Sequence, residues 1–242
     1  MRFRVFSVVV GFALAIGVAV AVSTAGASRP ISPTGAGAQG KAQVVRSAPD
    51  ALVSLFDNNN NDSGVGITSQ NFESSFDAYD SYAADDIHVP AGHVWVVKKV
   101  NVTGVYYNGS GPAASENVRF YTNKQHLPNT LKKEYLAVAG ADNGSGSFAI
   151  SLPSGARLSG GPAAGAGKTY WVNVQVNMDF GSGGQWGWEG SLNSVGDLDA
   201  WQNPGGGFGT TCATWDQEYD CIGDLGQGPS KMFELRGKDL TP

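Results

Sequence analysis

Charged residues are scarce in this sequence. Only 15% of the 242 residues are Asp, Glu, Lys or Arg, and the formal net charge is −5. Proteins that bind nucleic acid usually carry a basic stripe or patch, whereas positive charges are adjacent here only in pairs, such as Lys132 and Lys133. The composition therefore argues against a nucleic-acid partner.

The motifs of common hydrolases are also missing. The chain has no G-x-S-x-G segment to place a serine nucleophile on a sharp turn, and no H-E-x-x-H segment to place two zinc ligands on one helix face. We therefore expect binding without catalysis. An unrecognised secreted hydrolase stays open as an alternative, because Glu189 beside Trp188 is a carboxylate of the kind that glycoside hydrolysis uses in pairs.

Cysteine is represented by two residues only, Cys212 and Cys221. They do not have the C-x-x-C spacing of many metal and redox pairs, and no histidine lies near them in the sequence. In an exported protein, two cysteines predict one disulfide. Because the loop that it closes is short, we expect this disulfide to hold a local segment rather than the whole fold.

Long apolar runs are confined to the N-terminus. Two arginines precede an apolar run at positions 5–22, and small residues follow as far as Ala27. This is the form of a secretory signal peptide, so we expect residues 1–27 to be cleaved near Ala27 and the mature protein to be extracellular; an uncleaved membrane anchor is the alternative. Cleavage removes two of the 16 basic residues and none of the 21 acidic ones, which gives a formal charge of −7. No later segment is long and apolar enough to predict a membrane span.

Glycine is abundant, with 34 residues, and apolar residues fall into short runs between Gly, Pro, Asn and Asp. This pattern is typical of consecutive strands and turns. Residues 28–50 are small, polar or proline and predict a flexible leader. Residues 51–237 predict one domain, and 238–242 a short tail.

Alternating apolar residues predict the individual strands. In the segment 170–180, apolar residues occupy every second position, and the segment 93–107 has valines in one phase. About nine or ten such segments, without a convincing helix, predict an all-β fold. The expected architecture is a two-sheet antiparallel sandwich of jelly-roll or galactose-binding-like form.

Three segments resemble those of secreted bacterial β-sandwich domains. They read DAYDSYAADDIHVPAGHVWVVKKVNVTGVYYNGSGPA, YWVNVQVNMDFGSGGQWGWEG and WQNPGGGFGTTCATW. The resemblance extends over most of the chain after residue 55, and it implies a jelly-roll or galactose-binding-like sandwich outside the cell. It implies no particular activity, because such domains occur alone or beside catalytic or repeat domains.

The segment DNNNNDSG contains a run of oxygen ligands. Calcium prefers carboxylate and amide oxygens on a loop that can wrap it, and Asp57, Asn59, Asn61 and Asp62 supply them. The spacing is not that of an EF-hand, because Asp62 stands where the sharp-turn glycine belongs. Two interpretations stay open: a structural calcium site, and a polar turn whose side chains bond their own backbone. No other cofactor is expected.

The glycine-rich segment 185–221 holds four of the six tryptophans. If it is extended, Trp186 and Trp188 share one face, and exposed aromatic rings stack on the apolar faces of sugars while polar side chains bond hydroxyl groups. The predicted ligand residues here are Gln185, Trp186, Trp188, Glu189 and Trp201. The alternative is that the rings fill the cores of large loops.

The segment 170–180 supplies a second candidate surface. Its polar positions Asn173, Gln175 and Asn177 alternate with the apolar ones, and Trp171 lies at the end of this row. On a concave sheet face, Trp171 and Gln175 would line a glycan groove; the alternative is a face that simply meets water.

These observations together predict a secreted, non-catalytic module that binds extracellular glycans or another surface polymer. The alternative from a different class is a structural or adhesive protein of the cell surface or matrix, with no small ligand. Solvent exposure of Trp186, Trp188 and Trp201 separates the two hypotheses, because buried rings cannot stack on a ligand that arrives from solution.

Overall fold

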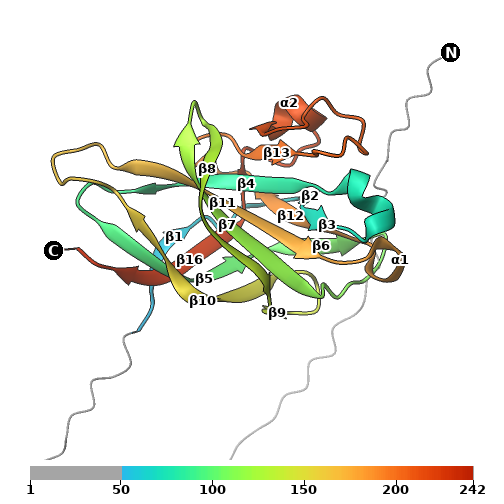
Figure 1. Cartoon of the computed structure of the whole chain (residues 1–242), viewed down its shortest axis with the longest axis horizontal. Coiled ribbons are helices and arrows are strands. Elements are labelled where there is room, and N and C mark those ends of the chain that lie inside the picture. The colour runs from blue at the N-terminus through green and yellow to red at the C-terminus, as the bar shows by residue number, and fades with distance from the viewer. Residues whose placement is uncertain (1–50, 242) are drawn as a thin grey trace, which may run out of the picture. The chain divides into compact units, whose positions relative to one another are not determined.

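The computed structural model describes residues 51–241 (Figure 1). The predicted signal peptide (1–27) and leader (28–50) lie outside the described residues. Antiparallel strands dominate the described part, and its helices are short. They are the 3₁₀ helix η1 (Ser74–Tyr79) and the α-helices α1 (Phe180–Gly183) and α2 (Glu218–Ile222). The all-β prediction is confirmed.

One sheet has five antiparallel strands in the order β1-β16-β5-β10-β9. Its members are β1 (Val53–Asp57), β16 (Phe233–Asp239), β5 (Val94–Val102), β10 (Phe148–Ser159) and β9 (Gly140–Asp142). Of the four valines predicted to share one phase, Val100 and Val102 are buried on β5, whereas Val94 and Val96 are half-buried. Strand β16 continues to Asp239, which pairs with Trp95, so the chain is still in a strand where the tail 238–242 was predicted to begin.

A second sheet has seven strands in the order β14-β13-β4-β11-β7-β8, with β3 paired in parallel to β11. Its members are β14 (Asp216–Gln217), β13 (Ala200–Gln202), β4 (Tyr82–Val89), β11 (Lys168–Asn177), β7 (Ser115–Lys124), β8 (Leu127–Val138) and β3 (Gln70–Asn71). The central strand β11 is the one that the alternation at 170–180 predicts. Figure 1 shows β13 and α2 beside β4, at one edge of this sheet.

A third, four-stranded sheet adds to the two that the sequence predicts. Its members are β15 (Ser230–Lys231), β12 (Gln185–Ser191), β2 (Asp62–Thr68) and β6 (Gly104–Tyr107). Strand β12 contains Trp186 and Trp188, and it pairs with β2, β6 and β15 rather than with either larger sheet. Strands of two to four residues, such as β15 and β6, are too short to show a period, so the sequence pattern does not reveal them.

All three sheets contribute to one apolar core. Val100 of β5, Val172 and Val174 of β11, and Trp186 and Trp188 of β12 are buried in the same cluster. In Figure 1 the strands of the seven-stranded sheet cross in front of β5 and β16, as expected for a sandwich. Within residues 51–241, no helix combines the length and the apolar character that crossing a bilayer requires.

Candidate functional site

The tryptophans predicted to form an exposed platform are buried. Trp186 and Trp188 are 0% exposed, and Trp201 is 2% exposed. Each indole nitrogen donates a hydrogen bond to a backbone carbonyl inside the protein. Trp186 and Trp188 do share one face of β12, but that face is the core face. The predicted stacking platform is therefore wrong for these three rings.

The physical reason is the space that a neighbouring glycine leaves. Gly104 of β6 lies against Trp186 across the strand pair, and a Cβ atom at Gly104 would overlap the indole. The ring also packs on Phe148, with 5.7 Å between ring centroids, and its Nε1 donates to the carbonyl of Gly146 at 2.7 Å. A large ring whose one polar atom is satisfied inside the core gains most from burial.

Gln185 and Glu189 lie on the opposite face of β12 from the two tryptophans, and both are half-buried. The amide oxygen of Gln185 accepts a hydrogen bond from the Asn108 side chain at 2.6 Å. Burial raises the pKa of Glu189, with a further contribution from Asp62. The predicted group of Gln185, Glu189 and exposed tryptophans is thus divided between two faces of one strand.

The predicted calcium residues Asp57, Asn59, Asn61 and Asp62 are exposed at the end of β1 and the start of β2. Asp57 accepts a hydrogen bond from the backbone N–H of Asn59, and Asp62 accepts one from that of Gly64. These are the contacts of the polar-turn alternative. Asn61 is also engaged, since its side chain donates to Asn193. Calcium binding at this turn stays a prediction.

The second candidate surface is the face of β11 that carries Asn173, which we call the outer face of the seven-stranded sheet. The strand register aligns a row of five residues across it: Ala200, Ala84, Asn173, Arg119 and Glu134. The neighbouring row pairs Asp86, Trp171 and Tyr121. Strand alternation thus places small, amide, cationic and aromatic side chains on one surface.

The amides of the outer face are joined to one another. Arg119 donates to the side-chain oxygens of Asn173 and Gln175, both at 3.1 Å, and Asn117 donates to Gln175 and Asn177. Asn173 and Gln175 are buried as a result, at 0% and 1% exposure. The alternative prediction was a sheet face exposed to water. In the structure, polar side chains of β7 cover the centre of this face. The network fixes the Arg119 side chain, which remains 14% exposed.

Three aromatic rings surround this network. Trp215 lies 6.3 Å from Tyr82 and 5.8 Å from Tyr121, measured between ring centroids, and both pairs are edge-to-face. The Arg119 guanidinium lies 5.4 Å from the Tyr82 ring centroid, within cation–π range. All three rings are half-buried, whereas Trp171 behind them is fully buried, with Nε1 donating to Asn123. Trp171 therefore supports the cluster and does not reach solvent.

The disulfide-bonded loop holds Trp215 in place. Cys212 and Cys221 form the predicted disulfide, with their Cα atoms 5.6 Å apart. Trp215, between them, packs against the small cluster of Ala84, Trp171 and Ala200. Because two of these residues are alanines, their small side chains leave room for the indole ring.

Replacing both Cys212 and Cys221 with serine is expected to lower the free energy of unfolding by about 2.5–3 kcal/mol, from the loop-closure entropy of so short a loop. Urea denaturation followed by circular dichroism measures the change. The emission of Trp215 should also shift, because its loop is released. An unchanged midpoint would show that the packing of Trp215 alone holds the loop.

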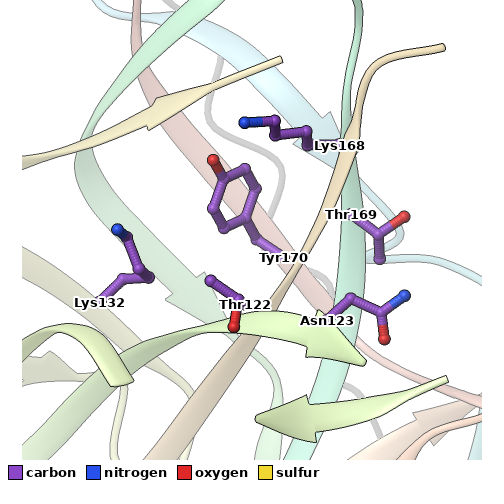
Figure 2. A pocket seen from close by; sticks show the side chains of 6 residues that line it. All are labelled: Thr122, Asn123, Lys132, Lys168, Thr169 and Tyr170. Atoms are coloured by element: carbon purple, nitrogen blue, oxygen red, sulfur yellow. The ribbon is translucent and has the colours of Figure 1, made fainter. Parts of the chain in front are cut away.

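Open hollows lie near both ends of β11. One of about 330 Å³ is lined by Thr122, Asn123, Lys132, Lys168, Thr169 and Tyr170 (Figure 2). The Tyr170 hydroxyl in it donates to the carbonyl of Ser159 at 2.9 Å. The other, of about 210 Å³, includes Asn177 and Asp179. Neither hollow is an enclosed apolar pocket of the kind usual for small-molecule ligands. The outer face therefore suits an extended ligand better.

Asp86 is a carboxyl at the edge of the outer face with an altered proton affinity. It is buried, and its Oδ1 accepts a hydrogen bond from the backbone N–H of Asp197 at 2.7 Å. Burial raises its pKa to about 7; the Asp197 N–H lowers it, and the Asp197 charge adds to the rise. His126, whose Nδ1 lies 2.6 Å from Asp197 Oδ1, opposes the rise.

This gives a prediction for pH dependence. Because the folded pKa of about 7 exceeds the ordinary 3.8, folded protein retains a proton that the unfolded chain releases between these values. The contribution of Asp86 to stability is therefore present at low pH and lost as the pH rises toward 7. Urea midpoints measured from pH 4 to pH 8 should depend less on pH in Asp86→Asn than in the parent protein. Equal slopes would contradict the assignment.

Four residues of this cluster are not among the predicted site residues: Tyr82, Arg119, Tyr121 and Trp215. A signal for two of them exists in β7, where Arg119 and Tyr121 alternate with the buried Val118 and Phe120. Strand β11 shows a similar alternation of polar and apolar residues. The two patterns together indicate strands that each present polar and aromatic side chains on one face.

Comparisons with known proteins do not identify a family. No family model, no curated protein and no solved structure matches the chain. The antiparallel sheets agree with the sandwich that the sequence resemblance implies.

Proposed function

We propose that the protein is a secreted, non-catalytic binding module whose outer face recognises extracellular glycans. The observation that supports this most is the cluster of Tyr82, Tyr121 and Trp215 around the Arg119 guanidinium. Within residues 51–241, no side chain or backbone group hydrogen-bonds to the hydroxyl of either tyrosine. Aromatic rings of this kind stack on the apolar face of a sugar ring, while Arg119 and the free hydroxyls bond its hydroxyl groups.

Two further features favour an extended extracellular ligand. The amide network holds Arg119 in a fixed position before any ligand binds, which lowers the entropic cost of binding. The disulfide that carries Trp215 is a bond that persists in oxidising compartments outside the cell. On this proposal the chain is a secreted bacterial sandwich domain of the jelly-roll or galactose-binding-like type.

A structural or adhesive role is the second candidate. The burial of Trp186, Trp188 and Trp201 favours it, because the aromatic segment with the most tryptophan stabilises the fold instead of facing a ligand. This role requires no small ligand at Trp215.

A glycan array and polysaccharide pull-down with the secreted protein test the proposal. We expect Trp215→Ala and Tyr121→Ala each to weaken binding about tenfold or more, which corresponds to about 1.4 kcal/mol. Tyr219→Ala is the matched control, because Tyr219 belongs to the same loop and is 59% exposed but makes no contact with this cluster. Loss of binding in a chelator would support calcium at Asp57–Asp62.

Each other outcome has a clear meaning. Equal loss in Tyr219→Ala would show that disturbance of the loop, and not stacking, weakens binding. Absence of binding to any glycan by the parent protein would contradict the proposal and leave the structural role.

A further inference from the structure

A lysine and two carboxyl groups are buried together beside the disulfide-bonded loop. The side chain of Lys231, in β15, is fully buried, and its Nζ lies 2.7 Å from Glu218 Oε1 and 2.8 Å from Asp199 Oδ2. Asp199 immediately precedes β13, and Glu218 is the first residue of α2. A primary amine is therefore held between carboxyl groups from two other segments, away from water.

Backbone contacts fix these three segments relative to one another. The N–H of Glu218 donates to the carbonyl of Asp199 at 2.9 Å, and the N–H of Asp199 donates to that of Pro229 at 3.1 Å. The N–H of Lys231 donates to Asp85 Oδ2 at 2.7 Å. Groups held in this way meet without further loss of entropy, which is the condition under which intramolecular reactions are fastest.

The two contacts of the lysine amine are of different kinds. Nζ donates a hydrogen bond to Glu218 Oε1. Its contact with Asp199 Oδ2, at 2.8 Å, is an ion pair. Within residues 51–241, Glu218 Oε2 has no hydrogen-bond partner. Buried carboxyl oxygens without donors are rare in folded proteins and require an explanation. An amine held this close to a carboxyl group by fixed surroundings needs little movement to reach the carboxyl carbon.

Burial also sets the protonation of the group. It raises the pKa of Glu218 to about 8, with Asp199 adding to the rise and Lys231 opposing it. The pKa of Asp85 is raised well above its ordinary value for the same main reason. Although burial favours a neutral amine, Asp199 and Glu218 raise the pKa of Lys231. The resting amine therefore keeps its proton. Nζ becomes neutral only when it passes a proton to a neighbouring carboxylate, and this transfer leaves the net charge of the buried group unchanged.

We propose that Lys231 Nζ and the side-chain carboxyl group of Asp199 form an amide bond, a covalent cross-link within the chain. The ammonium of Lys231 first passes one proton to Asp199 Oδ2, 2.8 Å away. The neutral amine then attacks Asp199 Cγ, a C–N bond forms, and the bond from Cγ to the protonated Oδ2 breaks. Protonated Glu218 gives its proton to the departing hydroxyl, which leaves as water, and Glu218 then takes the surplus proton from Nζ. Nothing is oxidised or reduced, one water is released, and Glu218 returns to its starting form.

The product removes the unfavourable features of the starting arrangement. An amide is uncharged, so the buried ammonium and one of the buried carboxylates disappear together, and with them the cost of keeping charges away from water. The cross-link joins β15, directly before the C-terminal strand β16, to the start of β13. With the disulfide nearby, the loop that carries Trp215 would be held at two covalent points.

Peptide mapping of the full-length secreted protein tests the cross-link, after reduction and alkylation of the disulfide. Trypsin cleaves after Lys and Arg, and neither occurs between Lys168 and Lys231. An acylated Lys231 resists cleavage, so we expect a peptide running from Thr169 to Arg236, lighter than its sequence by one water. Chymotrypsin, which also cleaves between Asp199 and Lys231, should leave the two pieces joined. Cleavage after Lys231 with the full sequence mass would overturn the proposal.

Glu218→Gln tests how the bond forms. Glutamine keeps the size of the side chain but does not exchange a proton with the amine, so we expect the cross-linked fraction to fall at least tenfold. Asp216→Asn is the matched control, because Asp216 is an exposed acid of the same loop; it should be cross-linked as fully as the parent protein. A formed Cys212–Cys221 disulfide and native circular dichroism establish that each variant is folded. Full cross-linking of Glu218→Gln would overturn the role of Glu218.

Discussion

Replacing Trp186 with alanine is expected to lower the free energy of unfolding by about 3–5 kcal/mol. The indole is 0% exposed, packs on Phe148 and donates to the carbonyl of Gly146. Its removal leaves a cavity lined on one side by Gly104, which has no side chain to fill the space. The loss therefore combines lost burial, an empty volume and a buried carbonyl without its donor.

Urea denaturation followed by far-ultraviolet circular dichroism measures this change. Trp186→Phe should lose less, because it keeps an aromatic ring and gives up mainly the hydrogen bond. Tyr219→Ala is the surface control, since that side chain is 59% exposed, and we expect a change within about 0.5 kcal/mol. A loss below about 1 kcal/mol in Trp186→Ala would show that the ring is not part of the folding core.

The case of Trp186 shows what periodicity reports and what it leaves out. Spacing places Trp186 and Trp188 on one face of an extended segment, and the structure agrees. Which face is buried depends on Gly104 and Phe148, distant in sequence, and no pattern within residues 185–191 contains that information. Glycines next to a tryptophan in the sequence suggest a loop. In the structure, a glycine on the neighbouring strand, Gly104, makes room for the indole ring.

The outer face also shows that periodicity does not predict burial. Alternation in β11 correctly separates Val172 and Val174 from Asn173 and Gln175. The polar pair is nevertheless buried, because Arg119 and neighbouring polar residues of β7 cover it. Sidedness is thus a property of one strand and can be predicted, while exposure depends on strand pairing. The disulfide is different: with two cysteines in the chain, its pairing needed no tertiary information.

The buried amine could not be predicted from the sequence at all. Lys231 stands in a short segment, SKMFELRG, where a lysine before a strand normally faces water. Its partners Asp199 and Glu218 belong to the segment 185–221, in which tryptophan and cysteine are the conspicuous residues. The pairing of β15 with β12, which places Lys231 opposite Gly190, and the bond from its N–H to Asp85 hold the lysine inside the protein.

Lys231→Met is expected to lower the free energy of unfolding by about 3–5 kcal/mol at pH 7, because it leaves Asp199 and Glu218 buried without a cation. Methionine keeps most of the apolar stem, so lost packing contributes little. Urea midpoints of the parent and the variant give the difference. Lys132→Met is the matched control, because Lys132 is exposed in β8 and its change should be small.

The pH dependence of that loss separates an ion pair from the proposed cross-link. Without the lysine, which opposes the rise, the folded pKa of Glu218 moves further above its unfolded value. The buried acid is then protonated and tolerated at low pH but costs free energy as the pH rises through its folded pKa. If Lys231 acts only through its charge, the deficit of Lys231→Met should shrink greatly at pH 4. If Lys231 is joined to Asp199, the variant also loses a covalent loop closure, worth about 4 kcal/mol for a loop of this length. The contribution of loop closure depends on chain entropy, which protonation does not restore. A large stability deficit that persists at pH 4 therefore favours the covalent bond. A deficit that disappears at pH 4 favours the ion pair.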